Sequence, residues 1–166
     1  IEEVFQQAEL GWLPGASLTD LTLEDEDAIG RPLVLRFSAR SSGVGVTQDG
    51  TLALRAAPMP LNIGAPFAAL PRRTTGLVVP YAPTLEATLH YRLTGARFES
   101  VPSSRSIEAE PGSFTSEITG ASGDAEVTVH VRSSLRTGVV PPENYEALAS
   151  YARQVDHAVQ DLLRAR

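Results

Sequence analysis

The chain of 166 residues contains no cysteine. A thiol nucleophile, a disulfide framework and a thiolate metal site are therefore excluded for this chain. Lysine is also absent, and the 14 basic residues are outnumbered by 20 acidic ones, which gives a formal net charge of -6 at pH 7. Because proteins bind nucleic-acid phosphates through clustered positive charge, we expect no nucleic-acid partner.

Long apolar runs and catalytic motifs are missing as well. No apolar run approaches the roughly 20 residues that a membrane-spanning helix needs, so we expect no direct membrane insertion. There is no Gly-x-Ser-x-Gly elbow, and Gly43-x-Gly45 lacks the further residues of a nucleotide-binding loop. We therefore predict that this chain is not an enzyme, with no catalytic residue, no cofactor-binding residue and no cofactor.

What the sequence does contain is a series of short segments with a period of two. Apolar and polar residues alternate most clearly over residues 85–93 and 127–135, which predicts two long strands with one apolar and one polar face. Asp49-Gly50 is typical of a two-residue hairpin turn. Shorter strand candidates cover residues 18–23, 33–39, 51–55, 76–79, 96–101, 106–109 and 114–118.

The period changes near the C-terminus. After Pro141-Pro142, apolar residues recur every three or four positions and predict an amphipathic helix whose apolar stripe needs a surface to cover: Tyr145, Leu148, Ala152, Val155, Val159 and Leu162. We predict a mainly β fold, a two-sheet antiparallel β-sandwich with this C-terminal helix packed on it. One domain is expected over residues 1–166, with a lead-in segment at 1–14 and the helix at 141–166. Since the chain opens with Ile1 rather than Met, we expect either a processed chain or a piece of a larger protein, and we favour the second.

Two histidines suggest a possible metal site. His90 and His130 occupy corresponding polar positions in the two long predicted strands, and paired strands would bring their imidazoles together with Glu86 or Glu126. Two imidazoles and a carboxylate are ligands that zinc accepts. The interpretation we favour is a solvated sheet face.

A second candidate is the acidic segment that contains Asp25 and Asp27. Several carboxylates on a loop followed by Gly30 are a possible calcium site, because hard cations prefer oxygen ligands. The spacing departs from that of the Asp-x-Asp-x-Asp-Gly loop, so we favour a solvated turn between two strands.

Adjacent arginines form the third candidate. Arg72 and Arg73, with the threonines that follow them, offer guanidinium groups and hydroxyls for a carboxylate or a phosphate. The favoured alternative is structural: an arginine that holds an irregular segment in place.

The stretch from Pro142 to Ala158 resembles the end of a known family. A proline, an acidic residue, Asn144-Tyr145 and a helix with Val155-Asp156 are similar to the C-terminal domain of unknown function found after the transglutaminase-like core of bacterial multidomain proteins. Leu70-Pro71-Arg72-Arg73 and Trp12-Leu13-Pro14-Gly15 are similar to the same family. The resemblance implies a β-sandwich in a protein that is exported or associated with the cell envelope, such as a periplasmic protein, with the catalytic residues upstream of Ile1.

Two functions follow as hypotheses. The first is a non-catalytic accessory or interaction domain whose partners are the upstream domains of the same polypeptide, in which case the parent is a transglutaminase-like enzyme. The second is a stand-alone β-sandwich module that binds a metal or a small-molecule ligand of unknown identity.

Overall fold

The computed structural model describes residues 15–24, 34–58, 61, 63–81 and 84–166. The chain divides into two compact units, residues 1–46 and 47–166. The first unit contains strands β1 (Ser17–Glu24) and β2 (Val34–Arg40), which pair with each other as an antiparallel two-stranded sheet. Both strands were predicted. The two units are described separately.

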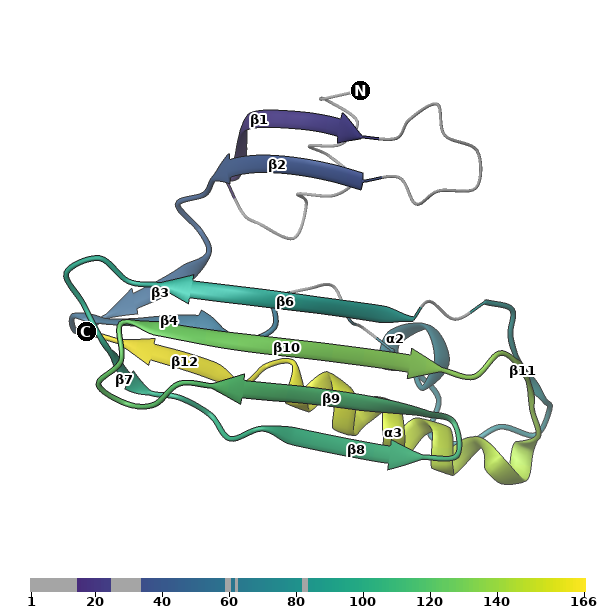
Figure 1. Cartoon of the computed structure of the whole chain (residues 1–166). Helices are drawn as coiled ribbons and strands as arrows, with labels where there is room; N and C mark the ends of the chain where they lie inside the picture. Colours follow the sequence, from purple (N-terminus) through teal and green to yellow (C-terminus); the bar gives the residue numbers. More distant parts are fainter. Residues whose placement is uncertain (1–14, 25–33, 59–60, 62, 82–83) are drawn as a thin grey trace. The chain divides into compact units, whose positions relative to one another are not determined.

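Most of the second unit consists of antiparallel sheets, as Figure 1 shows. One sheet has the order β6-β10-β9-β8 and is built from β6 (Leu85–Arg92), β8 (Arg105–Ala109), β9 (Gly112–Thr119) and β10 (Glu126–Leu135). The two long strands with a period of two are β6 and β10, and they pair side by side. Their alternating residues give this sheet an apolar inner face and a polar outer face.

A second four-stranded sheet has the order β3-β4-β12-β7. It contains β3 (Gly45–Gln48), β4 (Thr51–Arg55), β7 (Phe98–Ser100) and β12 (Leu162–Ala165). The predicted hairpin turn lies between β3 and β4, and both of its central residues have positive φ, 53° at Asp49 and 78° at Gly50. This is the backbone that Asp-Gly favours in tight hairpins.

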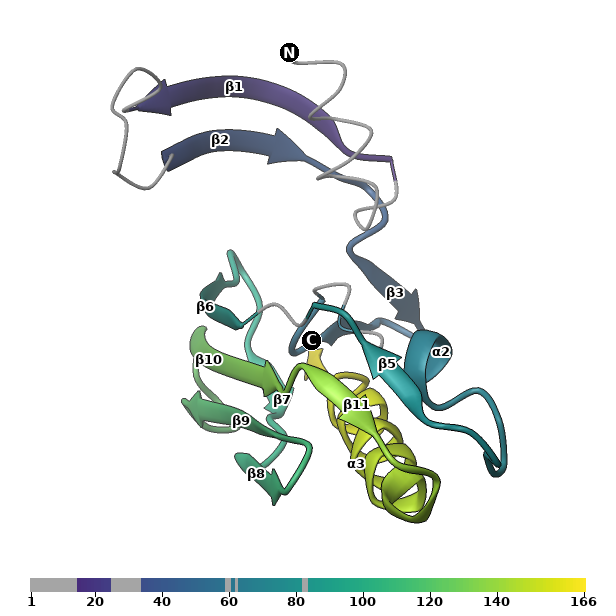
Figure 2. The ribbon, with the colours of Figure 1, turned by 90° about the vertical axis from the view of Figure 1, so that its right-hand side faces the viewer.

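Helix α3 (Tyr145–Ala158) follows a short 3-10 turn, η1 (Pro142–Asn144), and lies along the inner face of the β6-β10-β9-β8 sheet (Figures 1 and 2). Both sheets contribute to one core with the helix: Phe98 and Leu163 come from one, Phe114 and Val129 from the other, and Val155 from α3. All five side chains are 0% exposed. The predicted mainly β sandwich with a packed C-terminal helix is confirmed.

The longest helix in the described part of the chain, α3, has 14 residues. None of the helices described there is long and apolar enough to cross a membrane.

The predicted end of the helix was wrong. A helix over residues 141–166 was expected to bury Leu162, but α3 ends at Ala158 and Leu162 is 37% exposed in strand β12. Leu163 and Ala165 point inward instead, because the last residues have a period of two and lie between β4 and β7. Burial of this strand at the centre of a sheet outweighs its helical pattern.

Two small elements complete the fold. Helix α2 (Gly64–Phe67) lies between β4 and the next strand, β5. Strands β5 (Leu77–Val79) and β11 (Gly138–Val140) form a two-stranded ribbon beside the start of α3, as Figure 2 shows. Strand β11 was not predicted, because three residues beside Pro141 are too short for a period to be recognised.

Candidate functional site

The two strand histidines lie on the polar outer face of the β6-β10-β9-β8 sheet. His90 is opposite Thr128 and His130 is opposite Thr88, so the two imidazoles are diagonal neighbours on paired strands. The Nδ1 atom of His90 lies 3.1 Å from the hydroxyl of Thr128. The structure therefore brings both residues to one face, as expected, but each is bound to a different neighbour.

The carboxylate of Glu86 contacts two side chains on this face. Its Oε1 atom lies 2.9 Å from Nη2 of Arg132 and 3.1 Å from Nε2 of His130. The hydrogen bonds from Arg132 and then from His130 hold the pKa of Glu86 below its ordinary value. The other carboxylate considered, Glu126, pairs with Arg92 at 2.7 Å. Within the described residues no three histidine or carboxylate side chains are grouped so as to hold a metal ion.

The acidic candidates Asp25 and Asp27 lie outside the described residues. The paired arginines are described, and the structure separates them. Arg72 is exposed, whereas the guanidinium of Arg73 lies over the ring of Tyr145, with 5.8 Å between its central carbon and the ring centroid. Arg73 is therefore in a cation–π contact with the first residue of α3.

The hydroxyl of Tyr145 fixes the same loop. It donates to the carbonyl oxygen of Leu70 at 2.7 Å and accepts from the amide of Leu70 at 3.2 Å. Tyr145 itself is only 2% exposed. The side chain of Tyr145 thus joins two segments that are 75 residues apart in the sequence. Arg73 stabilises the same junction through its contact with the ring of Tyr145.

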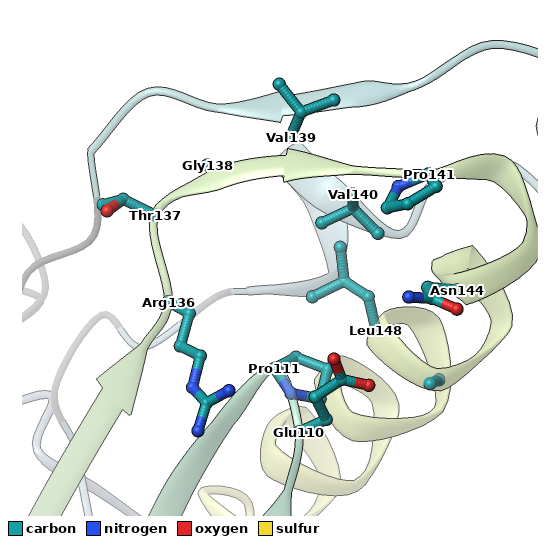
Figure 3. A pocket seen from close by; sticks show the side chains of 11 residues that line it. Glu110, Pro111, Arg136, Thr137, Gly138, Val139, Val140, Pro141, Asn144 and Leu148 are labelled. Carbon is teal, nitrogen blue, oxygen red and sulfur yellow. The ribbon is translucent and has the colours of Figure 1, made fainter.

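A pocket of about 210 Å³ lies near this end of α3, and no sequence pattern pointed to it. Figure 3 shows that Val140 and Leu148 point toward each other, with Glu110 and Arg136 on one side and Asn144 on the other. The backbones at the charged side are tied together, because the amide of Arg136 donates to the carbonyl oxygen of Pro111 at 2.8 Å. The pocket combines an apolar wall with one cation and one anion.

The β5–β11 ribbon exposes valine side chains. Val78 and Val139 are directly opposite each other and are 60% and 68% exposed. Tyr81, two residues after β5, is 70% exposed. Large exposed apolar groups that gather on one element often mark contact surfaces.

The model of one protein family matches residues 53–163, which is more than half of the chain. That family is described as a domain of unknown function with a solved structure (DUF3858). The chain belongs to this DUF3858 family. No curated protein and no solved structure matches the chain.

The matched range helps to locate what the DUF3858 domain contains. It includes both strand histidines, the Arg73–Tyr145 contact, the pocket and the β5–β11 ribbon. It excludes the β1–β2 hairpin. The candidate surfaces of the second unit are thus features of the DUF3858 part of the chain.

Proposed function

We propose that this chain is a non-catalytic accessory or interaction domain of a larger bacterial protein with a transglutaminase-like core, to which it binds through the β5–β11 ribbon. The DUF3858 match and the resemblance of the segment that begins at Pro142 support the family context. The observation that carries the proposal is the exposed pair Val78 and Val139. In this proposal the parent protein is exported or associated with the cell envelope, as in the family that the chain resembles.

The ribbon is suited to contact with a neighbour because its two faces differ. Val79 is buried at 1% exposure and holds the ribbon on the domain, while Val78 and Val139 face outward. Complete burial of a valine side chain contributes about 1.5 kcal/mol. Because Val78 and Val139 are 60% and 68% exposed, a neighbour that covers both would gain about two thirds of that value from each, or about 2 kcal/mol in total, and the flanking residues would add to it.

The contacts of the polar candidate residues Glu86, His130 and Arg73 support the proposal that the domain is non-catalytic. Glu86 is bound by Arg132 and His130, and Arg73 lies on Tyr145. A general acid, general base or nucleophile needs a positioned partner and access to substrate. These side chains have contacts that stabilise the sheet and the start of α3.

The test compares the domain alone with the longer polypeptide. The variant Val78→Glu/Val139→Arg places opposite charges directly across the ribbon, so the isolated domain should keep its melting temperature. In the longer protein both charges would be buried, and the stabilisation of this domain by its neighbour should disappear. Val46→Glu, at another exposed valine in strand β3, is the matched control and should leave that stabilisation intact.

Two results would contradict the proposal. One is a wild-type domain that melts at the same temperature alone and in the longer protein. The other is a parent sequence whose residues before Ile1 lack a transglutaminase-like Cys-His-Asp set.

A second function, a ligand-binding module, is favoured by one observation, the pocket between β11 and α3. It does not require a neighbouring domain.

A further inference from the structure

The pocket beside β11 has walls from three segments that the fold holds together. The turn after β8 supplies Glu110 and Pro111. The segment that follows β10 and contains β11 supplies Arg136 to Pro141, and the end of η1 with the first turn of α3 supplies Asn144, Ala147 and Leu148. The first two segments are held together because Gly112, which follows Pro111, pairs with Leu135, which precedes Arg136. The third is held because the hydroxyl of Tyr151 in α3 donates to the carbonyl oxygen of Ser134 at 3.0 Å. The pocket is therefore preformed.

Two opposite charges lie on the same side of this pocket, as Figure 3 shows. Glu110 and Arg136 are both exposed, and in the described part of the chain neither side chain makes an ion pair or a hydrogen bond. Their backbones are fixed next to each other by the hydrogen bond from Arg136 to Pro111. Both charged groups are thus available to a ligand that carries the complementary charges.

The rest of the pocket is mainly apolar. Leu148 is 1% exposed, and Val140 points toward it from the opposite wall with Pro141 beside it (Figure 3). The side chain of Val139 points away from Val140 and Leu148 in the same view, although Val139 is one of the residues that line the pocket. Val78, on the neighbouring strand of the ribbon, does not line it. Apolar walls with a few convergent polar groups are the usual composition of small-ligand sites.

We propose that this pocket binds a zwitterionic amino acid with a small aliphatic side chain. Its carboxylate would accept hydrogen bonds from the Arg136 guanidinium, which can donate two parallel ones. Its ammonium group would donate to the Glu110 carboxylate, and its aliphatic group would pack on Val140 and Leu148. A pocket of about 210 Å³ suits a ligand smaller than those that fill the usual sites of roughly 300–1,000 Å³.

The probe is L-valine, added to the whole chain and followed by amide chemical shifts. We expect saturable shifts at Gly138, Asn144 and Leu148 with a dissociation constant of about 1 mM, because the binding free energy of a ligand is limited by its small number of non-hydrogen atoms. Arg136→Gln and Glu110→Gln should each weaken binding about tenfold or more. Isovalerate, which is L-valine without the ammonium group, and isobutylamine, which is L-valine without the carboxylate, should also bind about tenfold more weakly than L-valine.

Matched controls are Arg132→Gln and Glu117→Gln on the outer face of the β6-β10-β9-β8 sheet, which should leave the dissociation constant unchanged. Absence of saturable shifts up to 50-fold above the expected dissociation constant of about 1 mM would overturn the inference. Equal binding of isovalerate and L-valine would overturn it too, because Glu110 would then have no role. The inference can be tested separately from docking through the ribbon, since Val78→Glu, at a residue that does not line the pocket, should leave valine binding unaffected.

Discussion

Asp156 offers the sharpest test of how the helices are joined. Its carboxylate accepts two backbone hydrogen bonds, from the amide of Ile63 to Oδ1 and from the amide of Gly64 to Oδ2, both at 3.0 Å. These amides begin α2, whose N-cap residue Ile63 makes no side-chain capping bond. The carboxylate of one helix therefore caps the other helix, 92 residues away along the chain for Gly64.

The expected cost of Asp156→Ala follows from these contacts. Hydrogen bonds to a charged group contribute about 1.5–3 kcal/mol each when buried. This site is only part-buried, and water can reach the freed amides, so we expect a loss of about 2 kcal/mol from the free energy of unfolding rather than the sum of two buried bonds. Equilibrium unfolding in urea measures this loss as a lower midpoint with an unchanged slope.

A double-mutant cycle with Gly64→Ala makes the test specific. A Cβ atom at position 64 would overlap Oδ2 of Asp156, so Gly64→Ala should displace the carboxylate and cost about as much as Asp156→Ala. In the Asp156→Ala background the overlap is gone, and Gly64→Ala should cost nothing or stabilise α2 slightly, because alanine is the better helix former. Equal costs of Gly64→Ala in both backgrounds would refute the described contact.

Three further predictions concern other contacts. Val155→Asp should lower the free energy of unfolding by about 3–5 kcal/mol, because it places an unpaired carboxylate at a position that is 0% exposed; unchanged urea stability would mean that α3 is not docked as described. Tyr145→Phe should cost about 1–2 kcal/mol by removing both bonds to Leu70, and a loss no larger than that of an exposed substitution would count against this junction. Because the pKa of Glu86 is lowered in the folded state, its contribution to stability is present above its unfolded value of 4.5 and is lost as the pH falls through the folded value. Arg132→Gln should raise that pKa in an NMR titration, and an unmoved titration curve would contradict the assigned cause.

The strands that could be predicted from the sequence are those whose two faces meet different surroundings. Strands β6 and β10 alternate because one face packs in the shared core and the other does not, and Asp49-Gly50 has the residues that a tight turn requires. Strand β12 was missed because Leu162 continues the three-and-four spacing of α3. Only the positions of β4 and β7 decide that Leu163 is the residue to bury.

The candidate sites could be predicted less well, because they depend on partners far apart in the chain. The sequence predicted that His90 and His130 lie on one face, but the ion pair between Glu86 and Arg132 depends on the register of β6 against β10. Arg73 was considered for anion binding, and the ring it lies on is 72 residues away. The pocket joins three separate segments and has no local pattern.

Hydrogen exchange at the β5–β11 ribbon tests the central claim most directly. The amides of residues 77–79 and 138–140 are compared between this domain alone and the longer protein, with β8 as an internal control because it lies in a different sheet. Docking through the ribbon predicts slower exchange at 77–79 and 138–140 in the longer protein and little change in β8. Equal exchange at the ribbon in both proteins would contradict the claim that this domain binds its neighbour through Val78 and Val139.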